Sequence, residues 1–120
     1  MQHNFRQYQI VFRIAALAAA GAGLYHLIAI VEPSLIPGGA LWRHGVFAVV
    51  DLACAPLFLK RPRWFVFAFA ALTLETIVSH GGHALRVWQQ QKHIDWFSSA
   101  VVVAVCLAMG LLTWDATSRE

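Results

Sequence analysis

The groups in this sequence that could do chemistry are histidines and two carboxyls set within apolar stretches. Asp51 and Glu75 each interrupt a run of apolar residues. Placing an ionised carboxylate in hydrocarbon costs several kcal/mol, so each carboxyl needs a proton, a cation or a hydrogen-bonding partner. Imidazoles are the nearest candidates, because five of the six histidines flank or enter the same stretches: His26, His44, His80, His83 and His93.

Helical spacing predicts that these groups meet. At about 1.5 Å per residue, His26 and His80 each lie roughly 24 Å from the inner ends of their helices, which puts them at similar depth. His44 and Asp51 are seven residues apart and share one helical stripe. We expect Asp51 about 10 Å below the outer end of its helix and Glu75 at comparable depth. The predicted site is an outward-facing pocket of His26, Asp51, Glu75 and His80, with His44 and His83 at its rim.

Binding of a transition metal or haem is the first chemistry that suits such a pocket. Imidazole is a good ligand for zinc, copper and iron, and a carboxylate completes a mixed site. The predicted cofactor-binding residues are His26, His44, His80 and His83. The predicted metal ligands are His26, His80, His83 and Glu75.

Proton transfer is the second chemistry, and hydrogen bonding between helices is the third reading. In the second, Asp51 or Glu75 is the catalytic group that exchanges a proton with a quinone or another lipid-soluble substrate, while a histidine relays the proton to the outer surface. In the third, the same groups only fix helix packing.

Three other polar residues have simpler interpretations: His93 as a solvated helix-end residue, Asp95 as a helix N-cap, and Arg13 as a side chain that reaches the inner headgroups.

The elements that position these residues are four apolar segments. The chain of 120 residues is 59% hydrophobic and only 12% charged, far from the soluble average. Each segment meets or approaches the roughly 20 residues that cross a bilayer. The predicted helices are about residues 10–31, 45–60, 64–84 and 94–114. Pro33, Pro37, Gly38 and Gly39 predict a loop after the first, and Lys60-Arg61-Pro62-Arg63 predicts a basic turn after the second.

The distribution of Lys and Arg predicts the orientation. Six lie at one set of helix ends, namely Arg6, Arg13, Lys60, Arg61, Arg63 and Arg119, and three at the other, namely Arg43, Arg86 and Lys92. By the positive-inside rule, both termini face the cytoplasm of a cell with an inner, or plasma, membrane. The fold class is therefore all-α, an integral membrane antiparallel four-helix bundle with N-in/C-in topology, forming one transmembrane domain over residues 1–120. Small residues over 15–23 would allow close helix packing.

Other function classes find no support in the sequence. The net charge of +3 comes from basic residues in short tracts between apolar segments, and this pattern argues against nucleic-acid binding. There is no Gly-rich phosphate loop. Cys54 and Cys106 show no CxxC spacing and are interpreted as small hydrophobes.

The layout resembles the DoxX-like small membrane proteins. The resemblance consists of four helices in about 120 residues, Gly45 and Asp51 within GVFAVVDLACAPLFL, and the basic turn that follows. It implies a link to membrane redox complexes, including quinone-reducing ones. The chain departs from that group in its histidine content, so the resemblance assigns no residue a role.

The leading interpretation is a small redox-associated membrane protein that binds a metal, haem or quinone within a larger complex. Its expected partners are membrane lipid and either a membrane protein or further copies of the chain. The alternative is a small membrane enzyme that performs acid-base chemistry on a lipid-soluble substrate. The third reading is a structural membrane subunit.

Overall fold

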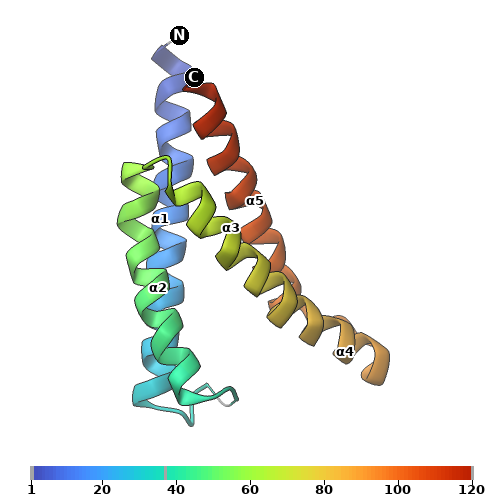
Figure 1. The fold of residues 1–120 in the computed structure, drawn as a ribbon. Coiled ribbons are helices and arrows are strands. Elements are labelled where there is room, and N and C mark those ends of the chain that lie inside the picture. Colours follow the sequence, from blue (N-terminus) through green and yellow to red (C-terminus); the bar gives the residue numbers. More distant parts are fainter. Residues whose placement is uncertain (1, 37, 120) are drawn as a thin grey trace. The chain divides into compact units, whose positions relative to one another are not determined.

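The regular structure in the described part of the chain is all helical, as the sequence predicts. The computed structural model describes residues 2–36 and 38–119. Its elements are α1 (Gln2–Val31), α2 (Leu41–Lys60), α3 (Phe65–Thr76), a π-helical turn (Ile77–Gly81), α4 (Gly82–Gln91) and α5 (Trp96–Ser118), drawn in Figure 1. In the described part of the chain, four helical stretches are long and apolar enough to cross a membrane: Tyr8–Val31, Leu41–Lys60, Phe65–Gln91 and Trp96–Ser118.

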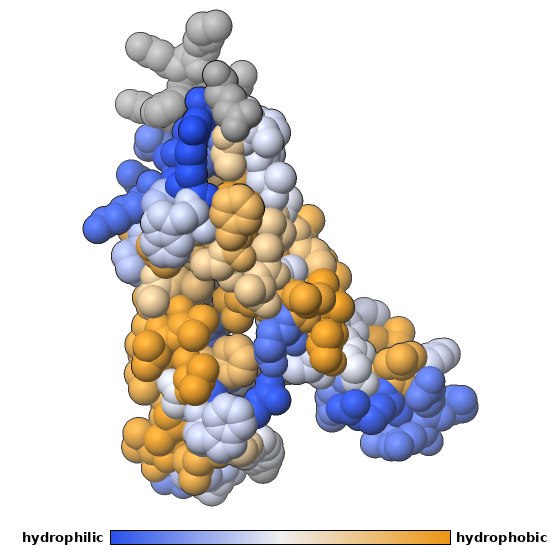
Figure 2. Space-filling view, viewed as in Figure 1, coloured by the Kyte–Doolittle hydropathy of each residue, from blue (hydrophilic) through white to orange (hydrophobic). Residues whose placement is uncertain are grey.

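Contacts group the chain into two compact units, Met1–Arg61 and Pro62–Glu120. Unit 1 is the hairpin of α1 and α2, and unit 2 pairs α3, the π-helical turn and α4 with α5. In Figure 2, apolar residues cover much of the visible face, and hydrophilic residues are concentrated on α4. Apolar side chains such as Leu17, Val49, Phe67 and Leu107 point outward, a surface suited to lipid rather than water.

The α1–α2 hairpin turns through two glycines. Gly38 and Gly39 have φ of 108° and 82°, in the region that residues with a Cβ rarely adopt. Helix α2 then begins at Leu41, earlier than the predicted start at residue 45, since Trp42, Arg43 and His44 already form its first turn. Asp51 is the eleventh of its 20 residues, about 15 Å from the loop end rather than the predicted 10 Å. The carboxyl is thus at the middle of the span.

Close approach of α1 to α2 depends on Gly23. A Cβ at this position would lie 2.6 Å from Leu52 Cγ and 3.1 Å from the Leu52 backbone nitrogen, whereas a Cβ on Gly21 would meet nothing within 4 Å. The small-residue stretch of α1 therefore packs against α2, at one residue in particular. That residue lies one helical turn before His26, so it sets the distance between the helices where the imidazole projects.

Unit 2 contains a longer helix than the sequence predicts. The third span runs from Phe65 to Gln91, and the expected end at Ala84 is wrong. Gly81 and Gly82 do not unwind the helix; the backbone instead widens into the π-helical turn Ile77–Gly81 and continues as α4. Such turns admit an extra residue and reorient the side chains around them. Helix α5 starts at Trp96 behind the Asp95 cap and ends at Ser118 rather than residue 114.

Candidate functional site

Three of the predicted site residues meet in unit 1. The Nδ1 atoms of His26 and His44 are 2.9 Å apart, and His26 Nε2 lies 3.6 Å from Asp51 Oδ2. The side chains of His26 and Asp51 are 18% and 16% exposed, so both are largely buried. The imidazole of α1 thus bridges a residue at the loop end of α2 and a carboxyl at its midpoint.

Local backbone structure fixes His44 at the loop end of this chain of contacts. His44 Nε2 lies 2.9 Å from the Gly38 carbonyl oxygen. The loop folds closely over the ring, since a Cβ on Gly39 would lie 3.0 Å from that Nε2. The two glycines of the loop therefore do more than turn the chain: one accepts a hydrogen bond from His44 and the other leaves room for its ring.

The hydrogen-bond partners determine which nitrogen carries each proton. A carbonyl oxygen can only accept, so His44 Nε2 donates to Gly38. In neutral His44 the other nitrogen, Nδ1, then accepts, and the proton between the two rings must belong to His26 Nδ1. This leaves His26 Nε2, the atom that faces Asp51, as the acceptor in a neutral ring.

When it is neutral overall, the His26–Asp51 pair holds one proton between Nε2 and the carboxyl. Either Asp51 is a neutral acid facing the bare Nε2 of His26, or Asp51 is a carboxylate facing an imidazolium. The distance of 3.6 Å is within ion-pair range and beyond hydrogen-bond range, so transfer needs the two groups to close by about half an ångström or to share a water. Both arrangements keep the pair neutral overall, which is the net charge that burial favours.

Aromatic rings enclose the imidazole of His26. The Phe47 ring stacks on it at 5.5 Å between centroids, and the Tyr25 ring meets it edge-on at 5.3 Å. Phe47 also carries the guanidinium of Arg43 5.7 Å from its centroid. The Phe47 ring thus contacts both the Arg43 guanidinium and the His26 imidazole.

The other predicted histidines form a second cluster, in unit 2. His83 Nε2 lies 3.3 Å from Asp95 Oδ2, and Asp95 Oδ1 accepts from the Ser98 backbone N–H at 3.2 Å. The Ser98 hydroxyl lies 3.5 Å from His80 Nδ1. Hydrogen bonds from the Ser98 hydroxyl and backbone N–H hold the pKa of Asp95 below its usual range, and the nearby His83 lowers it further. The predicted N-cap role of Asp95 is confirmed, because its side chain caps α5.

Glu75 lies in unit 2 with a hydroxyl partner. The Ser79 hydroxyl donates to Glu75 Oε2 at 3.5 Å, one helical turn away. The six predicted site residues are thus divided: His26, His44 and Asp51 lie in unit 1, and Glu75, His80 and His83 lie in unit 2.

The predicted metal set is divided in the same way. His26 lies in unit 1, whereas His80, His83 and Glu75 lie in unit 2. Among the residues that the structure describes, no three His, Cys, Asp or Glu side chains are grouped to hold a metal ion. Metal ligation by these four residues stays a prediction.

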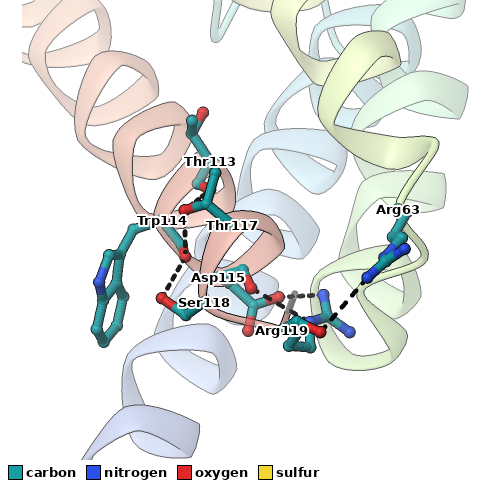
Figure 3. Close-up of polar contacts among 7 residues, drawn as sticks. All are labelled: Arg63, Thr113, Trp114, Asp115, Thr117, Ser118 and Arg119. Carbon is teal, nitrogen blue, oxygen red and sulfur yellow. Dashed lines mark hydrogen bonds and ion pairs between the residues drawn. The ribbon is translucent and has the colours of Figure 1, made fainter.

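An acidic residue that the sequence analysis passed over lies at the end of α5. Asp115 is buried and pairs with Arg119 one turn later, and the Arg119 carbonyl accepts from the Arg63 guanidinium at 3.4 Å, as Figure 3 shows. The hydroxyls around it bond to helix carbonyls, from Thr113, Thr117 and Ser118. In the sequence, the spacing of Asp115 and Arg119 at i and i+4 indicates such an ion pair on a helix. The sequence analysis did not use this spacing because it predicted that the helix ends at residue 114. These contacts tie α5 to the start of unit 2.

In comparisons with known proteins, no family model, no curated protein and no solved structure matches the chain.

Proposed function

We propose that the α1–α2 hairpin is a proton relay that connects a carboxyl at the middle of the membrane with the outer surface. The observation that carries the proposal is the series of contacts from Asp51 through His26 and His44 to Gly38, of 3.6, 2.9 and 2.9 Å, which ends at the loop before α2. A carboxyl halfway along a span has no structural advantage over an apolar residue unless it has a partner or a task. The imidazole that lies 3.6 Å from this carboxyl belongs to His26, which contacts His44 at the loop end of α2.

The relay requires the chain to span a membrane. Four stretches of suitable length and hydropathy support multi-pass insertion, and the excess of Lys and Arg at the ends that include the α2–α3 turn supports cytoplasmic termini in an inner membrane. The Gly38–Gly39 loop then faces outward. Asp51 lies about 15 Å below that loop, and His26 and His44 occupy the interval.

The transfer can be written atom by atom. Starting from the neutral pair, Asp51 first passes its own proton to His26 Nε2, and the resulting Asp51 carboxylate then takes a proton from the substrate. His26 then releases its Nδ1 proton to His44 Nδ1, and His44 releases its Nε2 proton to water at the loop. One proton enters and one leaves, while both rings exchange tautomers and must rotate before the next transfer. The reverse sequence delivers a proton inward.

The substrate class follows from depth and chemistry. A proton donor that reaches the middle of a bilayer must be lipid-soluble, and the hydroxyl of a quinol is one that gives up protons when it is oxidised. Quinone exchange also agrees with the redox association expected from the DoxX-like layout. The electrons would pass to a membrane-protein partner within a larger assembly, and the hairpin would handle the protons.

Redox-induced infrared difference spectroscopy on the protein in lipid vesicles tests this proposal. With a short-chain benzoquinone added and reduced, we expect a carboxyl C=O band that responds to quinone reduction. Asp51→Asn should remove the band, whereas Glu75→Gln, the matched change at the other intramembrane carboxyl, should keep it. A band that survives in Asp51→Asn, or no response to quinone at all, would contradict the relay.

The metal or haem interpretation predicts a different outcome. Elemental analysis and an absorption spectrum of the purified protein would then show stoichiometric metal or a haem band. That signal would disappear when His26 and His80 are both replaced by alanine. Neither result depends on the response of Asp51 to quinone, so the two readings are separable.

A further inference from the structure

A pocket opens at the opposite end of the same hairpin, where α2 ends and α1 begins to be apolar. It has a volume of about 330 Å³ and is lined by Gln9, Phe12, Arg13, Leu59 and Arg61. Two of these five residues are cations, one carries an amide and none is acidic. The lining combines the apolar side chains of Phe12 and Leu59 with N–H donors on Gln9, Arg13 and Arg61, a combination that suits an anion attached to an apolar body.

Arg61 is held in this pocket by an unusual backbone. It caps α2 with φ of 50° and ψ of 53°, and its N–H bonds to the Leu57 carbonyl oxygen at 2.7 Å. This left-handed position normally takes glycine or asparagine. An arginine in this conformation has a strained backbone. Because glycine would fit the turn without strain, the arginine indicates a role for its side chain.

Two aromatic rings orient the Arg61 guanidinium. Its central carbon lies 4.8 Å from the centroid of Phe12 and 5.4 Å from that of Tyr8. Such contacts use the flat face of the guanidinium, whereas paired hydrogen bonds to an anion use its edge. Stacking and anion binding are therefore compatible, and stacking reduces the rotamer freedom that binding would otherwise remove.

We propose that this pocket binds the phosphate of an anionic phospholipid. Arg61 donates paired hydrogen bonds to the phosphate oxygens, Arg13 adds the second positive charge, and Gln9 donates to a headgroup oxygen. Phe12 and Leu59 contact the start of the acyl chains. Guanidinium groups match phosphate geometry better than ammonium groups do, so arginine at both cationic positions fits this ligand.

The depth of the pocket agrees with a lipid ligand. Leu59 is the last residue but one of the span Leu41–Lys60, and Gln9 is the second residue of the span Tyr8–Val31. In a membrane-spanning hairpin both residues lie where phosphates of the bilayer lie. The inference requires that the hairpin spans the membrane, but it does not depend on the proton relay at the other end.

Native mass spectrometry of the full chain in detergent micelles tests the proposal, with phosphatidylglycerol and phosphatidylcholine as the probes. We expect phosphatidylglycerol to bind about tenfold more tightly, and Arg61→Gln to remove most of that difference. Lys60→Gln is the matched control, because Lys60 is adjacent, carries the same charge and does not line the pocket. It should change the affinity by less than about twofold.

One further variant and one competition experiment separate lipid binding from misfolding and from binding of free phosphate. Arg61→Gly relieves the left-handed strain, so this variant should fold at least as well as the wild type and still lose the preference for phosphatidylglycerol. Inorganic phosphate in large excess should not displace the lipid. Equal losses in Arg61→Gln and Lys60→Gln, equal binding of the two lipids, or displacement by inorganic phosphate would each overturn the assignment to an anionic phospholipid.

Discussion

At the scale of single residues, His26 is the side chain on which the proposed function depends. Its two nitrogens face different partners, His44 at 2.9 Å and Asp51 at 3.6 Å, so one ring connects the loop end of α2 with its middle. Replacing it by phenylalanine would keep the stacking on Phe47 and remove both proton contacts. A buried carboxyl would then lose its nearest imidazole.

The cluster of His83, Asp95 and Ser98 in unit 2 leads to a prediction about the stability of the α5 N-cap at low pH. The pKa of Asp95 is held down by hydrogen bonds from Ser98 and by His83. A depressed carboxyl pKa means that the carboxylate stabilises the folded state above the pKa of the unfolded chain, and this contribution is lost as the pH falls through the folded pKa. We expect the Ser98 amide, which donates to Asp95, to lose protection from hydrogen exchange below about pH 4.

Asp95→Asn provides the comparison for that measurement. Asparagine keeps an N-cap oxygen and removes the titratable group, so exchange at Ser98 in this variant should not change over the same acid range. Protection that falls equally in the wild type and in Asp95→Asn would show that Asp95 is not the titrating group.

The residue types of the proposed relay were predictable from the sequence, but their pairing was not. Intramembrane carboxyls and imidazoles stand out because they are costly in hydrocarbon, and this singled out Asp51, His26 and His44. Depth arithmetic paired His26 with His80. Depth alone does not say which face a side chain projects from. The structure places His26 beside His44 and Asp51 within unit 1 and His80 beside Ser98 within unit 2, and the pairing of His26 with His80 stays a prediction.

At the scale of elements, the α1–α2 contact rests on one glycine. Adding a methyl group at Gly23 would bring it into Leu52, and overpacking of this kind costs about 1–3 kcal/mol. We expect Gly23→Ala to lower the thermal stability of the purified protein and to separate His26 from Asp51. Gly21→Ala, two residues away in open space, should leave both unchanged. Thermal unfolding followed by circular dichroism would show the difference, and equal effects of the two variants would contradict a specific contact at Gly23.

Helix existence was predictable, whereas helix ends were not. Long apolar runs fix four spans because the pattern is far from that of soluble proteins. The ends are polar: the first turn of α2 contains Arg43 and His44, and α4 includes Arg86 and the glutamines up to Gln91. Hydropathy counts such residues as loop, although the backbone stays helical. The π-helical turn at Ser79 and His80 has no signal in hydropathy at all.

At the scale of the whole molecule, insertion and orientation are the properties on which the relay depends. We expect the Gly38–Gly39 loop outside and the carboxyl end of α5 inside, because Lys and Arg accumulate at the ends that include the basic turn. In a background with Cys54 and Cys106 replaced by alanine, Ser34→Cys should react with a membrane-impermeant maleimide on intact cells. Ser118→Cys should react only after the membrane is opened. The reverse pattern would place the histidine end of α2 in the cytoplasm and contradict an outward proton path.

The central claim is that His26 and His44 form a proton-conducting pair ending at Asp51, and nitrogen-15 solid-state NMR of histidine-labelled protein in lipid bilayers tests it most directly. At neutral pH the hydrogen-bond pattern predicts that His44 carries its proton on Nε2 and that His26 carries one on Nδ1, with a coupling between the two Nδ1 atoms. Asp51→Asn should change the signal of His26 Nε2 and leave Nε2 of His44 in place. If both rings carry the Nε2 proton alone, or if the two Nδ1 atoms show no coupling, the pair does not exist and the relay is wrong.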